Sequence, residues 1–283
     1  MSRSAKWLTI AIAIWAFGCG DDENGGSGSE GGAASGGDSQ GGAPLGGAAE
    51  GGSANGGASD GGAADGGAPT DGGGGSGGGS SPVCTEERTE ALGPIDTMST
   101  GDVIVLDEED GAATLFVDAS AGGIQEQANN PWIYLDLATL EKVAVTDVSA
   151  DADTAWDLAI KRPVVRTNSG DGGYAGEGGA VRLDAAFDDV TSADANAAFE
   201  TEGWFDADCT LKLDAGGAIS TTFDGWYEYD NTVVSPGGGT WLVRAGDGVK
   251  VFKLEILDYY SNPDGSSGTA GGRYRLRVAE VTP

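Results

Sequence analysis

Histidine is absent from this 283-residue sequence, and cysteine and methionine are scarce, with three and two residues respectively. Without histidine the chain cannot build a Ser-His-Asp or Cys-His catalytic site, and it lacks a common ligand of catalytic zinc and of haem iron. A pair of carboxylates could still catalyse glycoside hydrolysis, but no spacing of the acidic residues singles out such a pair. We therefore expect a protein that is not an enzyme.

Positive charge is also scarce. The sequence has 15 lysines and arginines against 45 aspartates and glutamates, which gives a formal net charge of −30. Recognition of nucleic acid needs a basic surface, so nucleic acid is excluded as a partner. Direct adhesion to anionic lipid is excluded for the same reason. The charge is typical of a well-solvated surface outside the cytoplasm, and calcium-stabilised folding is an alternative that the excess of carboxylates leaves open.

Long hydrophobic runs are missing as well. The only apolar run of note, Trp7–Phe17, has about eleven residues, whereas a transmembrane helix needs about twenty. Arg3 and Lys6 precede this run and Cys19 directly follows a glycine, so residues 1–18 are typical of a cleaved signal peptide. The junction resembles a bacterial lipobox, which implies cleavage before Cys19, a lipid on its thiol and anchoring in the lipid bilayer. An ordinary secretory signal, with an incidental Cys19, is the alternative.

The segment 19–82 has a composition that opposes folding. A five-residue unit beginning with two glycines repeats from Gly31 to Thr70, and Leu45 is the only large apolar residue after the acidic start of the segment. Such a chain cannot bury enough apolar surface to offset the entropy lost on ordering. We therefore expect a disordered linker with a root-mean-square reach of about 45 Å.

Two cysteines remain once Cys19 carries a lipid. In an exported protein, an even remainder predicts a disulfide, here between Cys84 and Cys209. Closing so long a loop contributes about 4–5 kcal/mol in the chain-entropy model. Two thiolates that bind a metal or haem are the alternative.

Residues 83–283 have the length and the apolar content of one domain, and their patterns predict an all-β, mostly antiparallel fold with minimal helix. Asp-Gly pairs separate many of the strands, most clearly at Asp247-Gly248. In the last strand, apolar residues alternate with arginines along 273–278, which indicates one core face and one solvated face. The expected strands are 103–106, 114–117, 132–137, 142–145, 156–161, 164–165, 181–183, 221–229, 240–244, 249–257 and 273–278.

Three further segments carry more specific predictions. Ser192–Phe199 is expected to form a short helix, and Asp151–Trp156 a single helical turn. The glycine-rich segment Thr167–Gly179 is interpreted as a long surface hairpin loop or, alternatively, as a mobile loop that grips a ligand. The aromatic residues of the second half either belong to the core or form a wall for a flat ligand.

The stretch Trp156–Arg162, with the sequence WDLAIKR, followed by RTNSG at Arg166–Gly170, resembles the HmuY family of bacterial surface lipoproteins. Weaker similarities flank this core, and their order holds over about residues 114–281. They are found at 132–143, 225–229, 248–254, 259–260 and from 273 onward.

The resemblance implies a hand-like β fold with a haem pocket between β fingers, in an outer-membrane or surface lipoprotein. Family members that bind haem use paired histidines or paired methionines as axial ligands. This chain has no histidine, and Met98 is the only methionine after the signal peptide, so neither pair carries over. Gly20 rather than aspartate follows Cys19, which favours the outer membrane.

Five residues in or near the family motifs are the candidate ligand-binding residues: Arg166, Asn168, Tyr174, Trp226 and Tyr227. Tyr174 is the candidate iron ligand, while arginine and the aromatic side chains would hold the propionates and the ring. We expect a membrane-anchored, non-enzymatic binding protein for haem or another tetrapyrrole. A structural or protein-interaction module at the cell surface, without haem binding, is the alternative.

Overall fold

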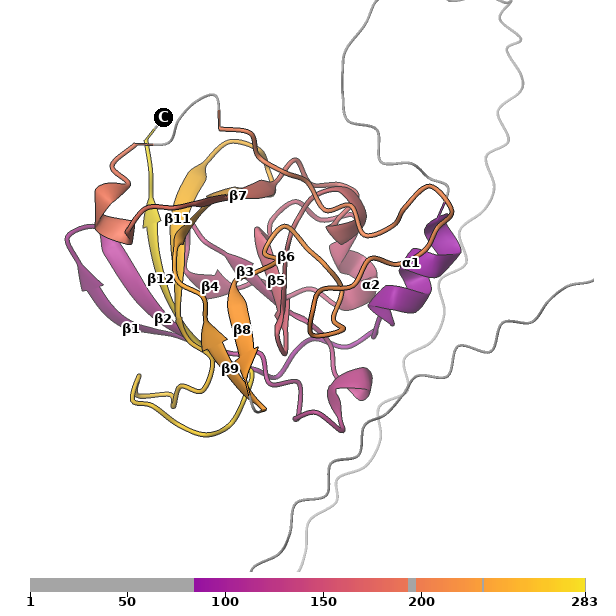
Figure 1. Ribbon diagram of the computed structural model, residues 1–283, viewed down its shortest axis with the longest axis horizontal. Coiled ribbons are helices and arrows are strands. Elements are labelled where there is room, and N and C mark those ends of the chain that lie inside the picture. The colour runs from indigo at the N-terminus through magenta and orange to yellow at the C-terminus, as the bar shows by residue number, and fades with distance from the viewer. Residues whose placement is uncertain (1–83, 193–196, 231, 283) are drawn as a thin grey trace, which may run out of the picture. The chain divides into compact units, whose positions relative to one another are not determined.

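The computed structural model describes residues 84–192, 197–230 and 232–282, and these form a mostly antiparallel β domain with little helix (Figure 1). The all-β prediction is therefore confirmed. The expected signal peptide, the lipidated Cys19 and the linker all lie outside the described residues.

The larger sheet has six antiparallel strands in the order β1-β2-β12-β11-β10-β7. Its central neighbours, β2 and β12, come from opposite ends of the domain sequence, so the sheet joins the start of the domain to its end. The strands are β1 (Val103–Glu109), β2 (Ala112–Asp118), β7 (Gly179–Leu183), β10 (Thr240–Arg244), β11 (Val251–Asp258) and β12 (Arg273–Glu280).

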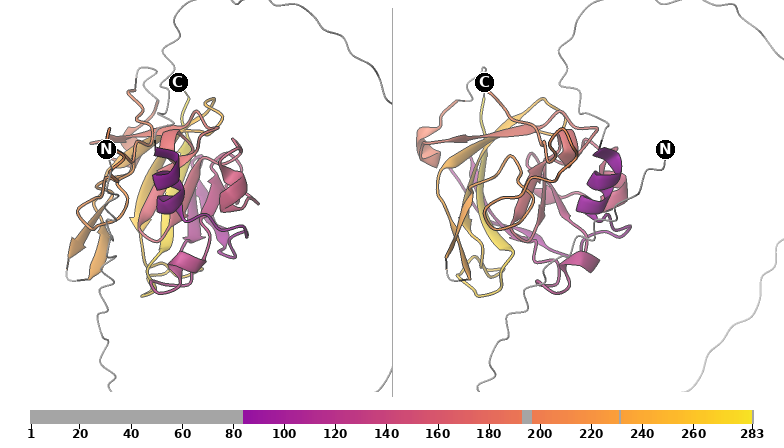
Figure 2. Two further views of the ribbon diagram at one scale, coloured as in Figure 1. Left: turned by 90° about the vertical axis from the view of Figure 1, so that its right-hand side faces the viewer. Right: turned by 45° about the vertical axis from the view of Figure 1, so that its right-hand side comes forward.

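A second antiparallel sheet has four strands in the order β4-β3-β5-β6, and β8 and β9 form a separate hairpin. Figures 1 and 2 show α1 and α2 at the end of the domain away from β1 and β2. The strands are β3 (Ile133–Asp136), β4 (Glu141–Lys142), β5 (Leu158–Lys161), β6 (Val164–Thr167), β8 (Tyr227–Asp230) and β9 (Val233–Pro236).

The main core lies between the two sheets. Alternate residues of β12, namely Tyr274, Leu276 and Val278, are at most 1% exposed and join this core, as the sequence pattern predicts. Ile133 of β3 and Leu158 of β5 face them from the smaller sheet. Each such side chain contributes about 1.5–3 kcal/mol through burial.

The arginines of β12 occupy the opposite face of the strand. Arg273 pairs with Asp118 at 3.3 Å and Arg277 with Asp188 at 2.8 Å, while Arg275 donates to the carbonyl of Gly265 at 2.8 Å. Two of the three arginines thus form ion pairs within the domain and the third binds a backbone carbonyl, in agreement with the expectation of a polar face.

Helix α1 (Thr85–Leu92) has no counterpart among the sequence predictions. The Cys84–Cys209 disulfide immediately precedes it, which confirms the predicted pairing. Arg88 fixes the helix to the domain, because its guanidinium pairs with Asp151 at 2.5 Å and donates to the carbonyl of Asp171 at 2.6 Å.

Local predictions of helix and strand were partly wrong. The helical turn expected at Asp151–Trp156 lies earlier, in α2 (Asp147–Ala150), because the Thr146 hydroxyl caps the backbone N–H of Ser149. The strand expected at 221–229 begins only at Tyr227, since turns occupy the residues before it. The helix expected at 192–199 falls partly outside the described residues. The remaining short helices are 3₁₀ turns at Gln127–Asn129, Gly170–Gly172 and Phe187–Asp189.

Candidate ligand-binding site

The glycine-rich segment Thr167–Gly179 reverses the chain through an antiparallel bridge between Ser169 and Glu177, but it is not the surface loop that the sequence predicts. It leaves β6 in the smaller sheet and enters β7 in the larger one, so it connects the sheets instead of reversing within either. Much of the segment is buried. A Cβ atom added at Gly173 or Gly176 would collide with the side chain of Asn168. The glycines are therefore required for close packing, which explains the composition without a ligand.

Asn168 fastens this connection to the smaller sheet. Its side-chain amide donates to the carbonyls of Asp153 and Trp156, each at 2.9 Å. Its backbone carbonyl accepts the N–H of Gly178 at 2.9 Å. The residue is fully buried. Asn168 thus holds the fold from a position that a ligand does not reach directly.

Arg166 points from β6 into a cage of four aromatic rings. Its guanidinium carbon lies 4.6–5.8 Å from the ring centroids of Trp132, Tyr134, Trp156 and Trp204. It donates to the Tyr134 hydroxyl at 3.1 Å and to the carbonyl of Gly172. Burial lowers the pKa of Arg166, but arginine stays charged in proteins. No carboxylate of the described residues forms an ion pair with it, so a positive charge is held behind these rings.

Tyr174 lies at the surface, 41% exposed, with the guanidinium carbon of Arg88 3.9 Å from its ring centroid. Its ring therefore packs on helix α1. The phenol remains a predicted iron ligand, but it does not line the pocket described below.

Trp226 and Tyr227 belong to a separate aromatic cluster with Tyr259 and Tyr274. The Trp226 indole donates to the carbonyl of Pro163 at 2.8 Å, and the Tyr227 hydroxyl donates to an Asp214 carboxylate at 2.7 Å. Burial raises the pKa of Tyr259 to about 12. The structure thus gathers Arg166 and Asn168 near Trp156 and places Trp226 and Tyr227 elsewhere.

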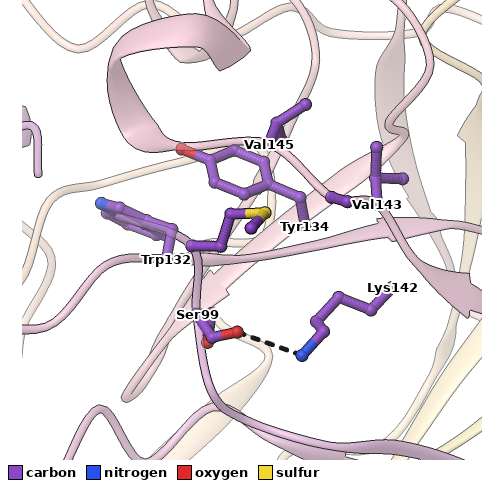
Figure 3. A pocket seen from close by; sticks show the side chains of 8 residues that line it. Ser99, Trp132, Tyr134, Lys142, Val143 and Val145 are labelled. Carbon is purple, nitrogen blue, oxygen red and sulfur yellow. Dashed lines mark hydrogen bonds between the residues drawn. The ribbon is translucent and has the colours of Figure 1, made fainter. Parts of the chain in front are cut away.

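An apolar pocket of about 240 Å³ opens on the outer side of the smaller sheet (Figure 3). One wall consists of Trp132, which directly precedes β3, and Tyr134, which belongs to β3. Val143 and Val145 form another wall. Tyr134 also contacts Trp156 edge to face, with ring centroids 5.1 Å apart. The residues that line the pocket are Met98, Ser99, Trp132, Tyr134, Lys142, Val143, Ala144 and Val145.

Positive charge surrounds the Trp132 wall, in contrast to the acidic protein as a whole. The Lys161 ammonium lies 5.9 Å from the indole centroid, and the Arg166 guanidinium 4.6 Å. At the rim, the Lys142 ammonium donates to the carbonyl of Ser99 at 3.0 Å (Figure 3) and to that of Gly101 at 2.7 Å. The site therefore combines an apolar wall with positive charge, which favours an anionic ligand that has an apolar body.

One buried carboxylate balances part of this charge. Asp147 accepts hydrogen bonds from the backbone N–H of Trp132 and from the Tyr134 hydroxyl, both at 3.0 Å. Burial raises the pKa of Asp147 and lowers that of Lys161. Because the carboxylate is occupied by these donors, it orients the aromatic wall.

The donor set fits a tetrapyrrole in part. Met98 is 56% exposed and lines the pocket, so its thioether offers one soft axial ligand. In the described part of the chain, no three potential metal-ligating side chains gather at one place. None of its helices is long and apolar enough to cross a membrane.

Sequence reasoning missed Lys142, Lys161 and Trp132 as site residues. The available signal was that Trp132 and Lys142 both lie in the upstream family segment and that Lys161 lies in the core motif. Their convergence depends on the pairing of β3 with β4 and β5, which no local pattern specifies.

Comparison with known proteins supplies the remaining finding. A search of curated proteins gives no match. The family model described as HmuY protein matches residues 128–274, which is more than half of the chain. The match runs from just before β3 into β12 and includes both the arginine cage and the Trp132 wall. The chain therefore belongs to the HmuY family, a family of haem-binding type.

Proposed function

We propose that this chain is a surface-exposed lipoprotein, anchored in the outer membrane through Cys19, that binds haem or another tetrapyrrole without catalysing a reaction. In this proposal, residues 1–18 are removed and 19–82 act as a tether for the domain at 83–283. The observation that carries the ligand assignment is the apolar Trp132 wall with two positively charged groups within 6 Å of its indole centroid, in a protein of net charge −30.

The chemistry of a tetrapyrrole matches this wall. Its flat apolar ring would pack against Trp132 and the valines, and its propionates would reach the ammonium of Lys142. That ammonium is held at the rim by the carbonyls of Ser99 and Gly101, so its position is already fixed beside the pocket. A single thioether at Met98 replaces the paired ligands of other family members, which predicts weaker iron ligation.

A haem titration of the purified full chain, followed by absorbance, tests the proposal. We expect a saturable shift of the Soret band at micromolar haem. Met98→Leu should move the band position and weaken binding because it removes the sulfur at nearly constant volume. Tyr174→Phe should leave the band unchanged. A band that responds to Tyr174→Phe and not to Met98→Leu would transfer the ligand role to the phenol.

The proposed contact between Lys142 and a propionate is tested by comparing two lysine variants. Lys142→Gln should raise the Kd for haem by about twofold to fivefold at low salt, the range of an exposed ion pair. Lys212→Gln is the matched control, because Lys212 is also exposed and also donates to a backbone carbonyl, that of Gly203 at 2.7 Å. Equal effects of the two variants would contradict a propionate contact at Lys142.

A structural or protein-interaction role without haem is the second candidate. The absence of histidine and the single thioether at the pocket favour it. A flat response in the haem titration, like that of an unrelated acidic protein, would reject the tetrapyrrole proposal and favour this alternative.

A further inference from the structure

A second pocket, of about 390 Å³, lies where the two sheets end together, next to the turn between β3 and β4. It is separate in its lining from the Trp132 pocket. Its lining residues are Glu108, Gly111, Ala112, Ala113, Leu137, Ala138, Leu140, Phe252, Val278, Ala279 and Glu280.

The floor of this pocket is part of the main core. Phe252 and Val278 are each 1% exposed, and Leu137 is 2% exposed. They contact the core cluster on one side and contribute to the pocket on the other. The pocket therefore offers a ligand an apolar surface that is already ordered.

Two carboxylates share the core-facing side of the sheet with this floor. Glu108 pairs across the sheet with Ala113, which pairs in turn with Val278, and Glu280 pairs with Phe252. Residues directly opposite each other in antiparallel strands project from the same face. Both glutamates therefore lie on the face that is apolar along the rest of β2 and β12.

The charge around this end of the sheets is unbalanced. Lys250 pairs with Glu280 at 2.9 Å, and Asp136 and Asp247 also act on the same ammonium, since they help to raise the pKa of Lys250. Within the described residues, no cationic side chain binds the carboxylate of Glu108. One lysine thus stands against four carboxylates, and the surplus is negative.

Protection of a sheet edge explains only part of this arrangement. β1 is an edge strand, and an inward-pointing charge such as Glu108 discourages pairing with another chain. β12 lies inside the sheet between β2 and β11, so Glu280 has no edge to protect. The Glu280 carboxylate is 55% exposed and already pairs with Lys250, so a cationic ligand of this pocket would share it with that lysine.

We propose that this second pocket binds a small organic cation that has an apolar body, such as an alkylammonium ion. The apolar body would lie on Phe252, Val278 and Leu137. The ammonium group would lie between the carboxylates of Glu108 and Glu280 and compete with Lys250 for the latter. This site does not depend on the proposed tetrapyrrole function.

The test uses n-hexylammonium chloride as the probe and the full chain carrying Cys19→Ser, so that no acyl group competes for the probe. Binding is followed by NMR of methyl-labelled leucine and valine. We expect saturable shifts at Leu137, Leu140 and Val278, and none with hexanoate, which has a similar body and the opposite charge. Added salt should weaken the binding.

Substitutions then separate the proposal from edge protection and from an incidental acidic surface. Glu108→Gln and Glu280→Gln should each raise the Kd by about twofold to fivefold. The matched control is Glu109→Gln, which removes the same charge from the next residue of β1, on the opposite face, and should change nothing. Lys250→Met should lower the Kd, because it frees Glu280.

Two results would overturn the assignment. One is equal binding of hexylammonium and hexanoate, because the carboxylates would then have no part in recognition. The other is a Kd that Glu109→Gln changes as much as Glu108→Gln does, because binding would then follow net charge alone.

Discussion

Asp157, in the core family motif, should make the domain less stable as the pH rises. Its side chain is buried, and its two oxygens accept the backbone N–H of Leu137 at 2.7 Å and of Gly246 at 2.8 Å. It thereby links the end of β3 to the turn after β10. Burial outweighs these two donors and raises the pKa of Asp157 from 3.8 to about 6.

The sign and the size of the Asp157 contribution to the free energy of unfolding follow from the linkage between proton binding and folding. The folded state holds a proton on Asp157 between about pH 4 and pH 6, where the unfolded chain has lost it, so stability is full below pH 4 and falls as the pH rises through 6. The pKa change corresponds to about 3 kcal/mol, and about 2 kcal/mol of it falls between pH 4.5 and 7.5. Titration starts at pH 4.5 because the sequence pI is about 4.1.

Asp157→Asn isolates this contribution. The amide keeps one acceptor and leaves one backbone donor unpaired, which costs about 1–3 kcal/mol at all pH values. The wild-type advantage over the variant in urea unfolding should therefore shrink by about 2 kcal/mol from pH 4.5 to 7.5. Asp208→Asn, at an exposed aspartate, is the control and should keep a constant difference.

A direct measurement completes this prediction. The side-chain carboxyl carbon of Asp157 should titrate in the NMR spectrum near pH 6. Titration near pH 4, together with parallel unfolding curves for the wild type and Asp157→Asn, would refute the reasoning that burial dominates over the two backbone donors.

Three further predictions concern the contacts that hold the domain together. Replacing Cys84 and Cys209 with serine should lower the free energy of unfolding by about 4–5 kcal/mol; an unchanged urea midpoint would contradict the loop-closure argument. Arg88→Met should lower the free energy of unfolding by about 1–3 kcal/mol, because it removes a largely buried ion pair and its hydrogen bonds. Glu87→Gln, on the exposed side of α1, should lower it by less than about 0.5 kcal/mol. Similar losses in both variants would show that general charge matters more than these contacts. Glu202→Gln should lower the free energy of unfolding by about 1–3 kcal/mol. The buried Glu202 carboxylate accepts five hydrogen bonds, and an amide cannot accept them all. Thermal unfolding of the variant at the wild-type temperature would show that the cost of burying the carboxylate cancels these hydrogen bonds.

Strands with strong alternation could be predicted from the sequence. β12 shows this best, because its period of two reports one buried face wherever the strand lies in the sheet. The hairpin at Asp247-Gly248 was predicted from turn chemistry, and β10 and β11 do pair across it. The disulfide followed from counting cysteines in a chain that the sequence predicts to be exported.

Features fixed by distant contacts could not be predicted. Helix α1 has few apolar residues, and it is held by the disulfide and by Arg88, whose partners are far along the chain. The glycines of 167–179 resemble those of a flexible loop, yet they are needed because Asn168 packs against them. Sequence reasoning likewise grouped Trp226 with Arg166, because similarity to two separate family segments gives no information on which part of the fold each residue occupies.

The order in which the chain is made has a consequence for how the larger sheet can form. β12 is the last strand to be synthesised, yet it lies between β2 and β11 and supplies the middle of the core. Until residue 280 has emerged, β2 has only β1 beside it, and a two-stranded hairpin is marginally stable in water. The larger sheet therefore stays incomplete through nearly all of the synthesis of the domain, which agrees with the proposal that the chain crosses a membrane before it folds.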